Sequence, residues 1–487
     1  MPRHRWLSAA LLPLVLAMLP AGAATLSAQP LDAPVADVRD AAPPIDNRSP
    51  AQERAMLDAI RRNVDALRRA GVLAPAVGAQ AVTFGLPLRL APGVPGEAGY
   101  FVSALADHDP AAGAVLDYHG GNRTYDGHRG IDFALWPFPW NKLDAGDVQV
   151  VAAAAGTILA KADVNPADHH CGQGGGGDWN YVALSHADGR MTIYGHMRHR
   201  SLTAKAIGAT VAQGEMLGTA ASSGDSSGPH VHFEVRAANF SPVWIDPFAG
   251  PHSQTESLWA DQPPYVDSAM NLLSTHAGPP SAPDPCQPAD MRLQDRFRAP
   301  AAVYIYAYYR DYQGALPTEV RVLRPDGTLF RSWTHTDETE FSRATSRAWT
   351  AQLAAGDPAG TWRVEATYNG RVHETSFTVE APEPPAPTLI ARDDEAQTVG
   401  AAPVTIPVLA NDGAADGDPL TLAAVDPPAN GAATIVGADV RYTARPGFVG
   451  TDAFTYTVRT AREQAKANVR VLVVGEVRRV WLPLLRR

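Results

Sequence analysis

The sequence predicts a mainly β protein: an antiparallel-sheet domain preceded by a short helix and followed by two β-sandwich modules. Three observations support this fold class. The 487 residues include 42 prolines and 41 glycines, which favours turn-rich β structure over helical bundles. Short apolar runs, separated by Gly, Asn, Asp and Pro, recur from about residue 82 onward, as expected for antiparallel strands. At roughly 150 residues per domain, the length suits about three domains.

Composition and charge narrow the classes of function. Hydrophobic residues make up 45% of the chain, which is enough for packed cores rather than global disorder. The chain has 41 Lys and Arg against 51 Asp and Glu, a formal net charge of −10 without long charge runs. Because this is the wrong sign for a polyanion binder, we expect no nucleic-acid partner.

The N-terminus has the three-part pattern of a signal peptide over residues 1–23. Two arginines precede an apolar run from Trp6 to Pro20, and small residues follow it. The run is shorter than the ~20 residues that a membrane-spanning helix needs, and no other window approaches that length, so no transmembrane segment is predicted. We therefore expect a secreted protein, in the extracellular space or the cell envelope.

Residues 24–75 are predicted to hold a linker and one amphipathic helix. Ser49 and Pro50 form the pattern of an N-cap followed by a favoured first helical residue, and the helix should end near Gly71. Apolar residues recur in it at helical spacing, namely Met56, Leu57, Ile60, Val64 and Leu67.

The remaining chain divides by composition into β-rich segments and linkers. The predicted order is an antiparallel β-domain (76–260), a Pro-rich linker (278–288), a β-sandwich (289–381), a second β-module (388–475) and an apolar-basic tail (476–487). A frayed terminus is favoured for the tail over an address or a docking strand.

Two cysteines leave two possibilities open. In a secreted protein, Cys171 and Cys286 can form a disulfide or remain free thiols. A bridge would close a loop of over 100 residues and, by the chain-entropy model, would stabilise the fold by roughly 4–5 kcal/mol.

Histidines locate the chemistry in the first β-domain, because eleven of the fifteen lie between His108 and His252. Three segments stand out, namely 127–132, 194–196 and 228–234. In the third segment, apolar residues alternate with His230, His232 and Glu234, so both imidazoles should lie on one face of a strand.

The other two segments are placed by a turn and a loop. Residues 181–186 and 191–197 should form a hairpin through a two-residue Asp188-Gly189 turn, which sets Ile193 opposite Leu184. Tyr194 and His196 should then share the face away from Ile193, so that His196 is displayed beside the strand with the two histidines.

His128 and Asp132 should lie in a loop that leads into a strand, because glycines flank His128 and apolar residues follow Asp132. Their mutual geometry is not settled by spacing. Two imidazoles and one carboxylate are a common catalytic zinc set, which leaves a fourth position for water.

The order His-x-Gly-x-Asp (128–132), Tyr-x-His (194–196) and Ser-Gly-Pro-His-Val-His-Phe-Glu (227–234) resembles the lysostaphin-type zinc metallopeptidases, also called LytM-type or glycyl-glycine endopeptidases. The turns at 150–157 and 211–218 resemble the same family, and the resemblance covers roughly residues 115–250. It implies one zinc per chain, bound by three residues and flanked by two catalytic ones. The implied zinc ligands are His128, Asp132 and His232, and the implied catalytic residues are His196 and His230.

The resemblance implies a secreted zinc-dependent endopeptidase, in which a zinc-bound water attacks peptide bonds of peptidoglycan cross-links or of another peptide polymer. The alternative is a non-catalytic cell-envelope binding or adhesion protein with a peptidase-like domain. The scissile bond, the division of roles between His196 and His230, an inhibitory role of the N-terminal segment and the oligomeric state stay open.

The C-terminal module resembles bacterial immunoglobulin-like or cadherin-like repeats, which implies spacing, adhesion or wall retention. Its aspartates could bind Ca²⁺, although aspartate is also an ordinary turn residue. The candidates are Asp393, Asp394, Asp412, Asp416 and Asp418.

Other motifs are weaker. Residues 224–228 match Gly-x-Ser-x-Gly, but only 56 positions separate Ser226 from His170, too few for a serine protease of two β-barrels. The His373-Glu374 pair lies in a predicted strand rather than in the helix that a zinc-protease motif needs. Residues 169–171 could bind a second metal, but a disulfide or a plain loop is favoured, and residues 174–177 are predicted to be a flexible loop.

Overall fold

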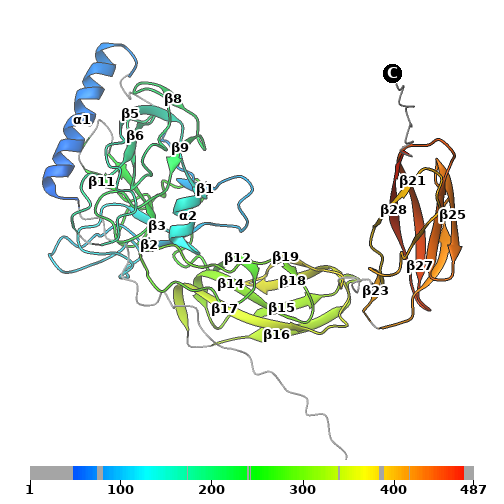
Figure 1. Cartoon of the computed structure of the whole chain (residues 1–487). Helices are drawn as coiled ribbons and strands as arrows, with labels where there is room; N and C mark the ends of the chain where they lie inside the picture. The colour runs from blue at the N-terminus through cyan, green and yellow to red at the C-terminus, as the bar shows by residue number, and fades with distance from the viewer. Residues whose placement is uncertain are drawn as a thin grey trace, which may run out of the picture. The chain divides into compact units, whose positions relative to one another are not determined.

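The computed structural model describes residues 48–73, 81–172, 174–237, 241, 243–337, 340–382, 389–415 and 417–475. These residues form a mainly β protein, which confirms the predicted fold class. The chain divides into two compact units, residues 1–382 and 383–487 (Figure 1). The predicted signal peptide and C-terminal tail lie outside the described residues. Within these ranges, no helix combines the length and the apolar composition that crossing a bilayer requires.

The predicted N-terminal helix is present as α1 (Pro50–Arg69). Ser49 and Gln52 form a reciprocal capping box, and the chain leaves the helix at Gly71 with a φ of 71°. The apolar face of α1 packs on one face of a sheet, against Leu159, Tyr181 and Ile193 among others. The amphipathic pattern therefore marks a helix that is docked on the first β-domain.

The first β-domain contains two sheets and the short helix α2 (Pro139–Ala145). The eight-stranded sheet has the order β2-β3-β10-β7-β6-β5-β8, with β11 paired to β10, and the smaller sheet has the order β1-β4-β9. The strands are β1 (Leu88–Leu90), β2 (Tyr100–Ala104), β3 (Ile131–Leu135), β4 (Val148–Val151), β5 (Gly156–Ala162), β6 (Tyr181–Ser185), β7 (Met191–Gly195), β8 (Thr210–Val211), β9 (Met216–Thr219), β10 (His230–Arg236) and β11 (Trp244–Ile245).

The β6–β7 hairpin is present, but the predicted register is wrong by one residue. Ile193 pairs with Ala183 and not with Leu184. The loop has three residues, 187–189, because the pair at its base is 186 and 190. Gly189 has a φ of 80°, as in a type I turn closed by a left-handed residue. The Asp-Gly signal thus predicted the hairpin but not the length of its loop.

A β-sandwich follows within the same unit. Its sheets have the orders β12-β14-β17 and β13-β19-β18-β15-β16. The strands are β12 (Ala269–His276), β13 (Arg296–Phe297), β14 (Ala301–Gln313), β15 (Thr318–Leu323), β16 (Leu329–His335), β17 (Phe341–Leu353), β18 (Gly360–Tyr368) and β19 (Arg371–Val379). Residues 269–276, which precede the predicted linker, therefore belong to the sheet of this sandwich.

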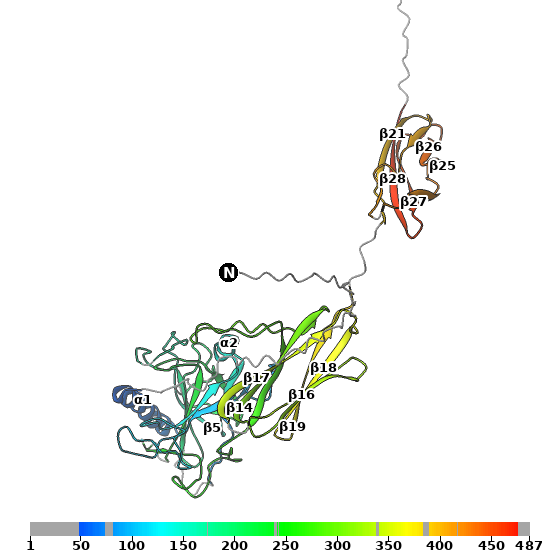
Figure 2. The same ribbon diagram turned by 90° about the horizontal axis from the view of Figure 1, so that it is seen from below.

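The sandwich packs directly on the first β-domain. Strands β14 and β17 lie next to β2 (Figure 1). Figure 2 shows β14 and β17 on the side of the sandwich nearest the first domain. Trp136 and Phe138 of the first domain pack against Tyr308 of β14. A buried ion pair crosses the same interface, where the Arg123 guanidinium donates to both carboxylate oxygens of Asp311 at 2.6 and 3.0 Å.

A disulfide adds a covalent connection. The structure joins Cys171 to Cys286, which is one of the two possibilities that the sequence left open. The indole N–H of Trp140 in α2 donates to the Pro285 carbonyl at 2.7 Å. The Pro-rich segment 278–288 is therefore held against the first domain.

The second unit is a separate β-module with its own core, which includes Ile406, Tyr442, Tyr456 and Val469. Its sheets have the orders β20-β23, β21-β28-β27-β24 and β22-β26-β25. The strands are β20 (Leu389–Ile390), β21 (Asp394–Val399), β22 (Val404–Ile406), β23 (Gly413–Ala414), β24 (Thr421–Val425), β25 (Gly431–Val436), β26 (Asp439–Ala444), β27 (Gly450–Arg459) and β28 (Gln464–Val474).

Candidate active site

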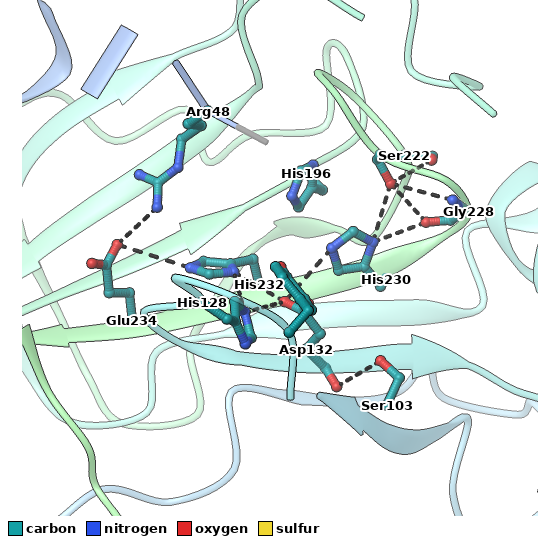
Figure 3. Close-up of polar contacts among 12 residues, drawn as sticks. Arg48, Ser103, His128, Asp132, His196, Ser222, Gly228, His230, His232 and Glu234 are labelled. Carbon is teal, nitrogen blue, oxygen red and sulfur yellow. Dashed lines mark hydrogen bonds and ion pairs between the residues drawn. The ribbon is translucent and has the colours of Figure 1, made fainter. Parts of the chain in front are cut away.

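The candidate site lies on one face of the eight-stranded sheet, where β3 and β10 run antiparallel. Asp132 of β3 pairs with His232 of β10, so their side chains lie side by side. Asp132 Oδ1 is 2.9 Å from Nδ1 of His232 and 3.7 Å from Nε2 of His230 (Figure 3). Both imidazoles therefore share one face, as the alternation of β10 predicted.

His128 approaches from the loop before β3, as its flanking glycines predicted. Its Nε2 is 3.2 Å from Asp132 Oδ1 and 3.3 Å from His232 Nδ1. Its Nδ1–H donates to the Leu105 carbonyl at 2.6 Å. Because a carbonyl can only accept, the neutral ring keeps its lone pair on Nε2, which is the nitrogen that faces Asp132.

His128, Asp132 and His232 together form a metal-binding geometry. One ligand atom from each lies within 4.8 Å of the others, and the three residues are 3%, 0% and 0% exposed. Two imidazoles and one carboxylate suit zinc and leave a coordination position for water. The donor set therefore fits the zinc that the sequence predicted.

The surroundings of the Asp132 carboxyl favour its charged form. Burial alone would raise its pKa, but the neighbouring His128 and His230 hold this pKa well below its usual value. The Tyr125 hydroxyl also donates to Asp132 Oδ2 at 3.1 Å. These contacts orient both carboxylate oxygens.

His196 reaches the site by a route that strand alternation does not predict. Gly195, and not His196, pairs with His232, so strict alternation would put His196 on the opposite face. The expectation that Tyr194 and His196 share a face is wrong, because Tyr194 pairs with Phe233 and packs in the core. His196 has a φ of 57°, and this left-handed conformation brings its ring centroid to 4.2 Å from that of His230.

The two histidines outside the candidate ligand set have matching proton arrangements. The Nδ1–H of His196 donates to the Ser223 carbonyl at 2.6 Å, and that of His230 donates to the Gly228 carbonyl at 2.9 Å. Each neutral ring therefore has its lone pair on Nε2. Both rings are almost fully buried. Such a pair can accept and return protons beside the candidate metal ligands.

Two aromatic residues that sequence reasoning missed complete the surroundings. The ring of Trp179 lies with its centroid 5.1 Å from that of His196 and 5.4 Å from that of His232. A Cβ on Gly195 would lie 1.8 Å from the Trp179 ring, so the close packing requires glycine there. Tyr125 stacks on His128 at 4.3 Å between centroids. Tyr125 lies three residues before His128 in the sequence, and this short separation could have indicated the contact.

A buried ion network borders the site on the side of His232. Glu234 Oε1 is 2.5 Å from Arg236, and Glu234 Oε2 is 3.2 Å from Arg48. Burial raises the pKa of Glu234, but the two guanidinium groups lower it to about 2. Glu53 of α1 contacts both Arg236 and Arg48, the latter at 2.8 Å. Sequence reasoning missed this network, because Arg48 and Glu53 lie far from Glu234 along the chain.

The competing motifs have structural explanations. Ser226 is buried, and its hydroxyl donates to the Gly228 carbonyl at 2.8 Å, next to His230 and not to His170. Because Cys171 is in the disulfide, it cannot be a ligand of a second metal. His373 lies in strand β19, which agrees with the prediction that it is not part of a helical zinc motif.

Of the candidate calcium ligands, Asp416 lies outside the described residues. The other four form no group of three in the part of the chain that the structure describes, where His128, Asp132 and His232 form the group found. Asp412 accepts a hydrogen bond from the backbone N–H of Arg392 at 2.7 Å. Asp393 accepts one from the backbone N–H of Asn468 at 2.8 Å. These two aspartates therefore bind loop backbone, and the structure gives calcium no support.

Comparison with known proteins identifies two domains. Residues 126–245 match the model of peptidase family M23, and residues 383–472 match that of a bacterial Ig domain. No curated protein matches the chain. All five candidate site residues lie inside the first match.

Among solved structures, the catalytic domain of the antimicrobial peptidase lysostaphin from Staphylococcus simulans is 24% identical, with a TM-score of 0.21 over 30% of this chain and 89% of that one. A Pseudomonas aeruginosa protein described as a peptidase M23 is 23% identical, with a TM-score of 0.17 over 37% of this chain and 56% of that one. The titin domains Z1Z2 are 13% identical, with a TM-score of 0.17 over 38% of this chain and 93% of that one.

Proposed function

We propose that this chain, which carries a peptidase family M23 domain and a bacterial Ig domain, is a secreted zinc-dependent endopeptidase. The observation that carries the proposal is the buried group of His128, Asp132 and His232, with the imidazoles of His196 and His230 beside it. A ligand set with neighbouring proton carriers is what metal-assisted hydrolysis requires.

His128, Asp132 and His232 would hold the metal. When bound, zinc supplies a Lewis acid that polarises a carbonyl and lowers the pKa of water to about 7. Asp132 contributes a negative charge, and the Leu105 carbonyl keeps the His128 Nε2 lone pair directed to the same point. Three protein ligands of this kind leave room for a water or a substrate oxygen.

His196 and His230 act on protons. Each holds its own proton at Nδ1 against a backbone carbonyl, so Nε2 is the atom that accepts a proton from the attacking water. The ring that has taken the proton of the water is then an imidazolium, and it donates this proton to the leaving amine. The other ring, when it carries a proton from solvent on Nε2, donates a hydrogen bond to the carbonyl oxygen as negative charge develops. Both rings hold Nδ1–H against a backbone carbonyl, so we assign these steps to the pair.

Peptide bonds in peptidoglycan cross-links are the proposed substrate, with another extracellular peptide polymer as the broader class. The signal-peptide pattern at residues 1–23 and the bacterial Ig domain support an extracellular or envelope location. The net charge of −10 gives no reason to expect a nucleic-acid substrate.

The test uses the full chain and measures zinc content and cell-wall hydrolysis together. We expect one zinc per chain and hydrolysis in the wild type. His232→Ala should lose both. His230→Ala should keep the zinc and lose about 10²- to 10⁴-fold in rate, because only a proton carrier is removed. His252→Ala changes an exposed histidine outside the M23 match, and this control variant should behave as wild type.

A wild-type protein that binds zinc at this site but hydrolyses neither cell walls nor peptides would contradict the proposal and favour an envelope-binding role. A zinc content that is unchanged in His232→Ala would show that the metal is bound elsewhere.

A further inference from the structure

His232 has two ring nitrogens with different surroundings. Its Nδ1 faces Asp132 at 2.9 Å and His128 Nε2 at 3.3 Å. Its Nε2 faces Glu234, with 3.9 Å between Nε2 and Oε2 (Figure 3). A histidine that binds a metal through Nδ1 must carry its proton on Nε2. The charge beside Nε2 therefore matters for the ligand role of Nδ1.

Glu234 supplies a fixed negative charge at that position. A carboxylate attracts an N–H and repels a lone pair, so Asp132, 2.9 Å from Nδ1, favours hydrogen on Nδ1, and Glu234, 3.9 Å from Nε2, favours hydrogen on Nε2. A metal ion held by Asp132 and Nδ1 would offset the attraction of Asp132, and Glu234 would then hold the hydrogen on Nε2. Glu234 is 0% exposed, so solvent does not screen this effect. A buried carboxylate needs compensating cations, and Arg236 and Arg48 provide them.

The compensation comes in part from the segment that precedes the peptidase domain. Arg48 donates to Glu234 and to Glu53, and its guanidinium lies 4.1 Å from the centroid of the Trp179 ring. Glu53, in the first turn of α1, also contacts Arg236. Glu234, Glu53, Arg48 and Arg236 thus meet in one buried network, and Arg129 adds a partly exposed guanidinium 3.8 Å from Glu53.

We propose that Glu234 is a positioning residue that holds His232 with Nδ1 toward the metal ligands, and that Arg48 and Glu53 of the N-terminal segment hold Glu234 for this task. The proposal rests on the proposed metallopeptidase function. It gives residues at and just before the start of α1 a role in positioning a metal ligand. A chain that begins at residue 76 would lack Arg48 and Glu53.

The test measures metal binding by the folded full-length chain. The zinc dissociation constant is obtained by competition with a chromophoric chelator, and the ligand geometry from the absorption spectrum of the Co²⁺-substituted protein. Glu234→Gln keeps the side-chain shape and should weaken zinc binding by about 10- to 100-fold. Arg48→Ala and Glu53→Gln should weaken it in the same direction, with a changed Co²⁺ spectrum.

Asp58→Asn is the matched control. It is the same kind of change on the same helix, in an exposed ion pair with Arg61 whose side chains are 55% and 53% exposed. It should leave the zinc dissociation constant and the Co²⁺ spectrum unchanged. The double variant Arg48→Ala/Glu234→Gln should lose less affinity than the product of the two single losses, because both substitutions act through one network.

The outcomes separate this inference from the function on which it rests. If Glu234→Gln lowers only the melting temperature, while the zinc affinity and Co²⁺ spectrum stay as in wild type, the residue is merely structural and the positioning role is overturned. The proposed function then stands. If the wild type itself binds no zinc through His232, the proposed function fails, and the positioning role fails with it.

Discussion

Asp394, at the start of β21, is expected to make the second unit sensitive to pH. Burial and the nearby charges of Asp412 and Asp393 raise the pKa of Asp394 to about 6 from 3.8. Because the folded state binds the proton more tightly, its stabilisation is complete below the unfolded pKa and is lost as pH rises through about 6. We expect the melting temperature of this unit to fall as the pH is raised from about 4 to about 6. The fall should be larger in wild type than in Asp394→Asn.

Differential scanning calorimetry of the full chain at several pH values would check this prediction. Asp439→Asn, on β26 of the same unit, is the control and should keep the wild-type pH dependence. If the melting temperature changed equally with pH in wild type and in Asp394→Asn, the prediction would be contradicted.

The positions of some side chains at the candidate site could be predicted from the sequence, and those of others could not. His230 and His232 were placed correctly because the period of a strand is fixed. His196 was expected near them for the wrong reason, since its place depends on a φ of 57° that no hydrophobic pattern encodes. The link between Arg48 and Glu234 spans 186 positions, and a single sequence carries no signal for such a pair.

At the scale of elements, the interface between the first β-domain and the sandwich depends on the ion pair of Arg123 and Asp311, whose side chains are 6% and 4% exposed. Arg123→Ala would leave the Asp311 carboxylate buried without its cation. We expect the free energy of unfolding of the first unit to fall by about 3–5 kcal/mol.

Urea unfolding followed by tryptophan fluorescence would measure this loss, because eight of the ten tryptophans lie between residues 136 and 362. Arg292→Ala is the control. It removes an exposed ion pair with Asp290, whose side chain is 63% exposed, and should cost less than about 1 kcal/mol. Similar losses in both variants would argue against a special role of the buried pair.

Local signals predicted the individual elements well. The Ser49-Pro50 cap and the apolar periodicity gave α1, and the Asp-Gly turn gave the β6–β7 hairpin. The register was missed because a single inserted loop residue shifts every pair. The docking of β14 beside β2 was not predicted, since the side chains in contact lie far apart along the sequence.

For the whole molecule, the disulfide between Cys171 and Cys286 joins positions 115 residues apart. The chain-entropy model gives a stabilisation of roughly 4–5 kcal/mol for a loop of this length. The variant Cys171→Ser/Cys286→Ser should therefore unfold at a lower urea concentration than wild type. Adding a reducing agent should bring wild type to the midpoint of the variant and leave the variant unchanged.

The urea midpoints with and without the reducing agent would check this expectation. Coincident midpoints for oxidised wild type and the double variant would contradict it.

The connections of the first β-domain to the segments around it also bear on how such a chain could be rearranged in evolution. A gene fusion that moved residues 76–260 alone into a new context would leave behind Glu53 of α1, Asp311 of β14 and Cys286 of the Pro-rich segment 278–288. A breakpoint after Pro382 cuts none of these connections. A peptidase module that keeps these connections is therefore larger than the family match, whereas the Ig module takes part in none of the three.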